Sequence, residues 1–183
     1  MPNEELKIMC LKYKIEQLKK QLKKLEDKQV LTTDERITIT GLNNRIKNYE
    51  ISVSILETSD LLKDDEIALI NREKQLEGRY DIYSVTDQLR LGYITFYPED
   101  FDTEKGSVGY SISMPHRGHN YAFKSLKLLS NYLSSEGIEK ISVFAEKANE
   151  VSVRIIDKFS EEVSYEDKSN DSFKKYIFSI NNK

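Results

Sequence analysis

Residues 117–122, Arg-Gly-His-Asn-Tyr-Ala, are of types that could bind a phosphate group. A predicted strand precedes them and a predicted helix follows, so a turn here would present free backbone amides at the positive end of a helix dipole. Gly118 lets the main chain approach a ligand closely because it has no Cβ, and Arg117 adds a positive charge. The same residues also fit an ordinary turn in which Asn120 caps the helix.

Two pairs of polar residues nearby could also take part in a reaction. Asn149 and Ser152 lie three apart at a predicted helix start. There Asn149 would cap the helix, and Ser152 would pack beside the cap. His116 and His119 are also three apart, but no cysteine and no obvious third ligand accompanies them. An exposed turn explains the two histidines better than a metal site, so we expect no bound metal.

The elements that would hold these residues are predicted from the apolar pattern of the C-terminal part. Runs rich in β-branched and aromatic residues predict strands, and apolar stripes at helical spacing predict helices. The predicted strands are residues 66–70, 81–85, 91–97, 107–114, 140–145, 162–165 and 173–180. One helix is predicted after Asn120 and stops at Gly137, and a second runs from Asn149 to Phe159. This order predicts an α+β domain, an α/β sandwich with a mixed sheet, over residues 59–183.

The N-terminal third carries two apolar repeats whose members are three and four residues apart. The first contains Ile8, Leu11, Ile15, Leu18, Leu22 and Leu25, and the second contains Ile39, Leu42, Ile46, Tyr49, Val53 and Leu56. Such repeats form seams that pack against another helix. Thr32 and Glu35 fit a capping box at the start of the second helix, which puts the turn near residues 29–31. Residues 1–58 are therefore predicted to form an antiparallel coiled-coil hairpin.

A seam between two helices buries little surface by itself. We therefore expect this hairpin to form a homodimer with a second copy or to brace the remaining domain, in preference to binding a specific effector.

Composition narrows the classes of partner. The net charge of −3 over 183 residues offers no basic field for nucleic acid, and the early lysines alternate with leucines as on a solvated helix face. Cys10 is the only cysteine, so no internal disulfide is possible. The chain shows no signal-peptide pattern and no apolar run near the roughly 20 residues that span a bilayer. We expect a cytoplasmic protein that does not bind membranes.

Three motifs together resemble the GNAT N-acetyltransferase superfamily over residues 66–180. Residues 117–122 are similar to the family's phosphate loop, Arg/Gln-x-x-Gly-x-Gly/Ala, which follows its fourth strand. Residues 149–152, Asn-Glu-Val-Ser, resemble the Asn-x-x-Ser that opens the next helix in ribosomal-protein acetyltransferases. Residues 109–112, Gly-Tyr-Ser-Ile, match the strand before the loop. The motifs occur in the family's order, with a helix and a strand between the last two.

The resemblance implies that acetyl-CoA, as co-substrate, lies in a cleft between the fourth and fifth strands. Residues 112–114 would pair with the pantetheine, residues 117–122 would cradle the diphosphate, and Asn149 and Ser152 would face the thioester. The implied coenzyme-binding residues are Ile112, Ser113, Met114, Arg117, Gly118, His119, Asn120, Tyr121, Ala122, Asn149 and Ser152. The implied reaction is transfer of an acetyl group to a primary amine by direct attack in a ternary complex.

The chain also departs from the family pattern. Asn120 replaces a glycine, although asparagine tolerates a left-handed backbone better than most residues. Ile156 stands where many members have a tyrosine acid, which leaves Ser152 as the catalytic acid. Phe144 stands where some relatives have glutamate, which leaves Glu146 or a chain of waters as the base. These departures keep a second function open: a non-catalytic CoA sensor, or a dimeric scaffold on a degenerate GNAT fold.

The acceptor side of the predicted domain also differs. Family members wall this side with two helices between the first and second strands. Only about ten residues separate Ile70 from Asp81 here, too few for that pair. We expect the N-terminal hairpin, from the same chain or from a dimer mate, to take the place of the missing helices.

Overall fold

The computed structural model of the chain describes residues 2–28, 30–58, 62–71, 73, 75–99 and 102–181, without the side chains of residues 2–4 and 102–104. The chain divides into two compact units, Met1–Thr58 and Ser59–Lys183. Gln29, in the predicted hairpin turn, lies outside the described residues.

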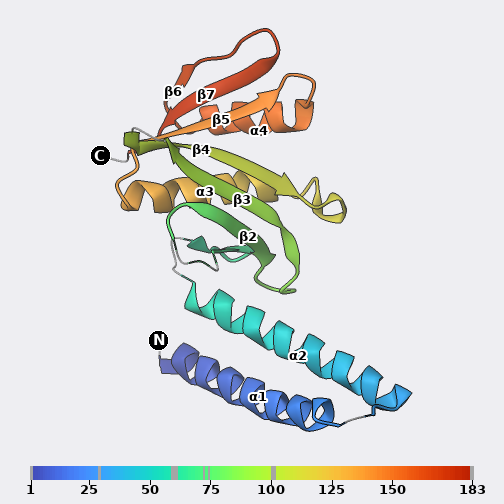
Figure 1. Cartoon of the computed structure of the whole chain (residues 1–183). Coiled ribbons are helices and arrows are strands. Elements are labelled where there is room, and N and C mark those ends of the chain that lie inside the picture. The colour runs from blue at the N-terminus through green and yellow to red at the C-terminus, as the bar shows by residue number, and fades with distance from the viewer. Residues whose placement is uncertain are drawn as a thin grey trace. The chain divides into compact units, whose positions relative to one another are not determined.

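The first unit is a pair of helices, α1 (Pro2–Glu26) and α2 (Thr33–Glu57) (Figure 1). Lys12 Nζ lies 2.6 Å from Glu57 Oε1 and Lys19 Nζ lies 2.7 Å from Glu50 Oε1, so the start of α1 faces the end of α2. The predicted antiparallel hairpin is confirmed, while its supercoiling stays a prediction. Among the described residues, no helix is long and apolar enough to cross a bilayer.

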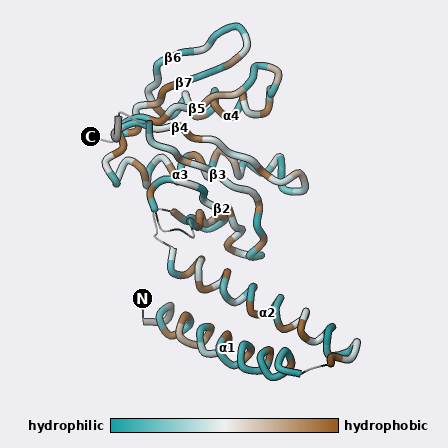
Figure 2. The backbone as a smooth tube through the Cα atoms, viewed as in Figure 1, coloured by the Kyte–Doolittle hydropathy of each residue, from teal (hydrophilic) through white to brown (hydrophobic). Residues whose placement is uncertain are grey.

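The seam between α1 and α2 contains ten of the twelve residues of the predicted apolar repeats, and Ile39 and Leu56 do not belong to it. Figure 2 shows hydrophobic and hydrophilic residues alternating along both helices. The buried cluster contains Ile15, Leu18, Leu42, Ile46 and Val53, with Ile8, Leu11, Leu22, Leu25 and Tyr49 packed against it. Each helix therefore buries one stripe and leaves charged residues on its other faces, as expected for an amphipathic helix.

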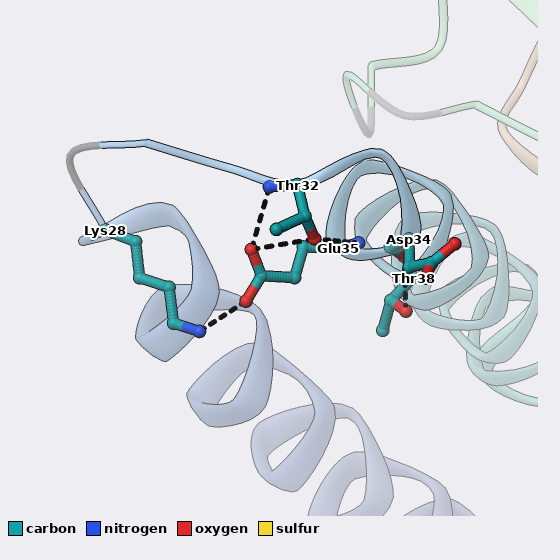
Figure 3. A network of polar contacts seen from close by, with 5 residues as sticks. All are labelled: Lys28, Thr32, Asp34, Glu35 and Thr38. Atoms are coloured by element: carbon teal, nitrogen blue, oxygen red, sulfur yellow. Dashed lines mark hydrogen bonds and ion pairs between the residues drawn. The ribbon is translucent and has the colours of Figure 1, made fainter.

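The start of α2 has the predicted capping box (Figure 3). The Glu35 N–H donates to Thr32 Oγ1 at 3.3 Å, and the Thr32 N–H donates to Glu35 Oε2 at 2.9 Å. Lys28 of the turn pairs with the same carboxylate. The hydrogen bond from Lys28, followed by those from Thr32, lowers the pKa of Glu35 from 4.5 to about 2. Two of the free amides at this helix start are thus satisfied by the protein itself.

The second unit is built on a seven-stranded sheet with the order β1-β2-β3-β4-β5-β7-β6. The strands are β1 (Ile67–Ile70), β2 (Gly78–Ser84), β3 (Arg90–Glu99), β4 (Asp102–Ile112), β5 (Lys140–Glu146), β6 (Tyr165–Asp167) and β7 (Phe173–Ser179). All neighbouring strands are antiparallel except β4 and β5, which are parallel. The predicted mixed sheet is therefore confirmed.

Two helices cover one face of this sheet (Figure 1): α3 (Tyr121–Ser135) packs on β1, β3 and β4, and α4 (Glu150–Ser160) packs on β5 and β7. Leu126, Leu129 and Leu133 of α3 are fully buried against the sheet, as are Ile156 and Phe159 of α4. Because α3 follows β4 and α4 follows β5, and these two strands are parallel, both helices begin at the same end of the strand pair.

The structure moves several predicted strand boundaries, including the start of β2 from residue 81 to Gly78, and three of the changes have a visible cause. β4 begins at Asp102 instead of residue 107, because pairing with β3 carries the polar segment into the sheet. It ends at Ile112 instead of residue 114, because a short 3₁₀ helix (Met114–His116) begins there. Pro115, inside this helix, has no backbone N–H with which to continue the strand. β6 spans Tyr165–Asp167 instead of residues 162–165, because the Val163 N–H still donates to Phe159 O in the last turn of α4.

Candidate functional site

The parallel strands β4 and β5 separate halfway along their length (Figure 1). They are paired only over residues 105–108 and 140–143. Beyond Val108, β4 continues to Ile112 paired with β3 alone, and beyond Val143, β5 continues to Glu146 paired with β7. The sheet therefore opens at the end where α3 and α4 begin.

The opened edge of β4 presents backbone groups to the gap. The Ser113 N–H donates to Leu91 O at 2.9 Å, so Ser113 faces β3. Peptide groups in an antiparallel pair alternate between facing the partner strand and facing away. Those of Ile112 and Tyr110 therefore face away from β3, towards the side that β5 has left.

The loop after β4 has the backbone shape that the sequence predicted. Gly118 has φ +85° and Asn120 has φ 65°, so Asn120 adopts the left-handed conformation expected of it. A Cβ added to Gly118 would meet no atom within 4 Å, which shows that the space in front of this residue is open. Asn120 is the N-cap of α3, but its side chain makes no capping hydrogen bond.

The free amides of this loop lie together. Among the described residues, no hydrogen-bond acceptor takes the N–H groups of residues 118–123. The Arg117 N–H is different, since it donates to Met114 O at 3.3 Å. Our prediction that free amides start at Arg117 is therefore wrong by one residue. A helix start with this many unpaired donors can accept an anion.

The side chain of Arg117 folds back towards β4. Its Nε donates to Ile112 O at 3.0 Å, which occupies the last carbonyl of the strand edge and leaves its two terminal nitrogens for a ligand. The ring of His119 bonds the carbonyl of Arg117 at 3.0 Å and stacks on Tyr121, with centroids 5.7 Å apart. The two histidines thus belong to the loop, and no group of three metal-ligating side chains occurs within the described residues.

The opposite wall is the start of α4. Asn149 Oδ1 accepts a hydrogen bond from the Ser152 N–H at 3.2 Å, which confirms the predicted cap. Ile156 is fully buried in the core, so its position offers no proton donor. Ser152 is the hydroxyl that this wall contributes to the cleft.

Tyr110 links the two walls, and we did not predict it. Its hydroxyl donates to Ser152 O at 3.3 Å, joining β4 to the first turn of α4 across the gap. Burial is the main reason that the pKa of Tyr110 is raised to about 12. The phenol therefore stays protonated near neutral pH and keeps donating this bond.

Together these elements enclose a cleft of about 550 Å³. Eight of the eleven predicted coenzyme-binding residues line it: Ile112, Arg117, Gly118, Asn120, Tyr121, Ala122, Asn149 and Ser152. Ser113, Met114 and His119 do not line it; Met114 is 77% exposed in the 3₁₀ helix, and His119 turns back on its own loop. The lining residues that were not predicted are Tyr110, Ser111, His116, Val151, Arg154 and Ile155.

A signal for one of these residues was present in the sequence. Tyr110 precedes Ile112 by two residues, so in a strand it shares the face of that residue. The cleft can bind an elongated ligand that has an anionic group near the loop and hydrogen-bonding groups along β4.

Comparison with solved structures gives partial matches at low sequence identity. A GNAT-family acetyltransferase from Bacillus anthracis is 14% identical, with a TM-score of 0.45 over 55% of this chain and 63% of that chain. Ribosomal-protein-S5-alanine acetyltransferase from Vibrio fischeri is 13% identical, with a TM-score of 0.45 over 57% and 60%. The chain thus spans less than two thirds of both. Diaminobutyrate acetyltransferase from Paenibacillus lautus, solved with its substrate and coenzyme A, is 16% identical, with a TM-score of 0.47 over 57% and 72%.

A search of curated protein sequences finds no match. The family model for the acetyltransferase (GNAT) domain matches residues 29–159, which is more than half of the chain. The match runs from the hairpin turn to the end of α4 and so contains the separated strands, the amide-rich loop and the Asn149 cap. The chain therefore belongs to the GNAT acetyltransferase family.

Proposed function

We propose that this chain is an N-acetyltransferase that moves an acetyl group from acetyl-CoA to a primary amine. The observation that supports this most is the cleft between β4 and β5, whose loop offers unpaired amides over residues 118–123 beside Arg117. Backbone donors at a helix start suit a diphosphate. The free edge of β4 suits the amides of a pantetheine arm, so the thioester would lie inside the gap.

The reaction follows by direct attack in a ternary complex. The amine nitrogen forms a bond to the thioester carbonyl carbon, the carbon–sulfur bond breaks, the thiolate takes up a proton, and the amine gives one up. The N–H groups of Tyr110 and Ile112, which face the gap, would stabilise the negative oxygen of the intermediate. Holding both reactants in one cleft supplies much of the acceleration.

Ser152 is the proton donor in this proposal. It lines the cleft, and its own N–H is fixed by Asn149. A hydroxyl can pass its proton to the departing thiolate and regain one from solvent. Glu146 at the exposed end of β5, or a chain of waters, would take the proton of the amine.

The alternative is a non-catalytic protein that binds CoA as a sensor or scaffold. The burial of Ile156 favours it, because the second turn of α4 then holds an aliphatic core residue and no acid. A sensor would keep the loop, the cleft and the Asn149 cap and would lack turnover.

One experiment separates the two functions. The melting temperature is measured with and without acetyl-CoA, and thiol release is followed on a panel of primary amines. A ligand at about 100 times its Kd stabilises the folded state by about 2.7 kcal/mol, a shift of several degrees. A shift with thiol release supports the enzyme, a shift without release supports the sensor, and no shift contradicts both. Arg117→Gln should reduce the shift, whereas Lys127→Gln, on α3 outside the cleft, should not.

A homodimer through the hairpin is also part of the proposal. Leu6, Met9 and Tyr13 on α1 are 54%, 61% and 63% exposed and do not belong to the seam between α1 and α2. They share one stripe of the helix at spacings of three and four, which fits a second helical partner. Light scattering on the full chain should give a dimer that Met9→Glu weakens, and a monomeric wild-type chain would contradict this.

A further inference from the structure

The cleft carries a second positive charge that the family motif does not account for. Arg117 lies on the loop before α3, and Arg154 lies on α4. Among the described residues, no carboxylate lines the cleft. The chain as a whole has a net charge of −3, so two arginines in a cleft lined by no carboxylate of the described residues are a local concentration of positive charge. Such a concentration raises the local concentration of an anionic ligand.

The guanidinium of Arg154 is only loosely held. Its Nε donates to Glu150 O at 3.3 Å, and its Nη2 lies 3.6 Å from Glu150 Oε2. The side chains of Arg154 and Glu150 are 74% and 81% exposed. Exposed ion pairs of this kind contribute little. A phosphate that accepts two parallel hydrogen bonds would displace the carboxylate, because arginine binds phosphate in a bidentate way.

The position of Arg154 differs from that of Asn149 and Ser152. Arg154 lies on the stripe of α4 that also holds Lys158, one turn later. Lys158 Nζ lies 4.3 Å from the ring centroid of Phe123 on α3. This stripe therefore faces α3, whose first residues Tyr121 and Ala122 also line the cleft. Arg154 thus lies between the two helices, outside the gap between the strands.

We propose that Arg154 binds the 3′-phosphate of the coenzyme's nucleotide, while the loop amides and Arg117 hold the diphosphate; this rests on the proposed function. Coenzyme A carries phosphate at two places, and its thioester end must enter the gap between β4 and β5. The nucleotide end then lies between α3 and α4, where Arg154 of α4 lines the cleft. Arg154 would thereby distinguish CoA from dephospho-CoA, which lacks only the 3′-phosphate.

The test measures binding of both ligands to the full-length chain by calorimetric titration. The wild-type chain should bind CoA about tenfold more tightly than 3′-dephospho-CoA, as expected for one charged hydrogen-bonded pair. Arg154→Gln should weaken CoA binding about tenfold and leave dephospho-CoA binding unchanged. Glu150→Gln should strengthen CoA binding, because it removes the competing carboxylate. Lys158→Gln, on the same stripe but outside the lining, should change neither affinity.

Three outcomes would overturn the assignment. Equal weakening of both ligands by Arg154→Gln would mean that Arg154 acts on the diphosphate or through its charge alone. Unchanged CoA affinity in this variant would mean that Arg154 does not bind the ligand. A wild-type chain that binds neither ligand would overturn the proposed function, and this assignment with it. Arg154→Lys keeps the charge and should retain part of the preference for CoA, so it guards against a variant that is simply misfolded.

Discussion

The helix starts of α2 and α3 differ in whether their backbone amides have hydrogen-bond acceptors within the protein. At α2, Thr32 and Glu35 bond each other's backbone, and Lys28 neutralises the carboxylate. At α3, Asn120 is the N-cap without a side-chain bond, and the amides of residues 118–123 have no acceptor among the described residues. Unpaired donors cost stability unless water or a ligand satisfies them. The helix start of α2 is thus satisfied by its own side chains, whereas the amides of α3 are available to the ligand that we propose.

The comparison is tested most severely at Gly118. Gly118→Val should weaken acetyl-CoA binding by more than tenfold, because a side chain would fill the open space in front of the amides. The strain of a β-branched residue at φ +85° should also cost about 1–2 kcal/mol of folding stability. Calorimetric titration and urea unfolding measure the two effects.

Gly137 provides a matched control for this change. It has φ +90° after the end of α3, and a Cβ there would also meet nothing within 4 Å. Gly137→Val should therefore lose similar stability while leaving acetyl-CoA affinity intact. If both variants lost acetyl-CoA affinity equally, the loss in Gly118→Val would come from reduced folding stability. The loop would then have no direct part in binding acetyl-CoA.

Asn120→Asp would make the start of α3 resemble that of α2. A carboxylate at a helix start interacts favourably with the dipole, so the folded state should gain about 0.3–1 kcal/mol. The same negative charge should repel the diphosphate and weaken acetyl-CoA binding about tenfold. Asn120→Gly keeps the left-handed backbone without the charge and should bind normally. A gain in stability with unchanged binding in the Asp variant would argue against the ligand role of this helix start.

Asn149 is an intermediate case, since its side chain caps α4 and also lines the cleft. Asn149→Ala should cost about 1 kcal/mol of folding stability through the lost cap. Asn149→Ser should restore most of that stability, because serine caps equally well. The serine variant removes the amide, so any loss of acetyl-CoA affinity that remains in it reports on ligand binding alone. If acetyl-CoA affinity fell and recovered together with folding stability in the two variants, Asn149 would act only as the cap of α4.

The start of α2 could be predicted because its motif is contiguous, and the same holds for the Asn149 cap. Gly118 and Asn120 were also readable, since a positive φ restricts the residue type at the position itself. Tyr110 and Arg154 were not predicted as cleft residues. Their roles depend on where β4 leaves β5 and on which stripe of α4 faces α3, and both follow from contacts between distant segments.

The boundaries of β4 also depend on contacts between distant segments and could not be predicted from the local sequence. Residues 102–106 are mostly polar and read as a loop, yet pairing with β3 extends the strand through them. The backbone of Ser113 gives a second example, because its N–H donates to Leu91 O and the register between two strands cannot be predicted from one strand alone. Local motifs thus locate the amide-rich loop, whereas the walls of the cleft can be located only once the pairing of the strands is known.

The smallest expected effect concerns acid and the capping box of α2. The pKa of Glu35 is lowered from 4.5 to about 2 in the folded chain, chiefly by Lys28. A lowered pKa contributes stability that is fully present above the unfolded value and is lost as the pH falls through the folded value. The melting temperature of the helical hairpin should therefore fall between about pH 4.5 and pH 2 more steeply in the wild-type chain than in Glu35→Gln.

Lys28→Met isolates the cause of that slope, because it removes the largest contribution to the shift and leaves both backbone bonds of the box in place. Titration of the Glu35 carboxyl by NMR should then give a pKa closer to 4.5, and the acid slope of the hairpin should shrink with it. An unchanged pKa in Lys28→Met would assign the shift to Thr32 and the helix start instead. In that case the backbone amides at the start of α2 would stabilise a negative charge, as those of α3 are proposed to do. The two helix starts would then differ only in how strongly they stabilise an anion.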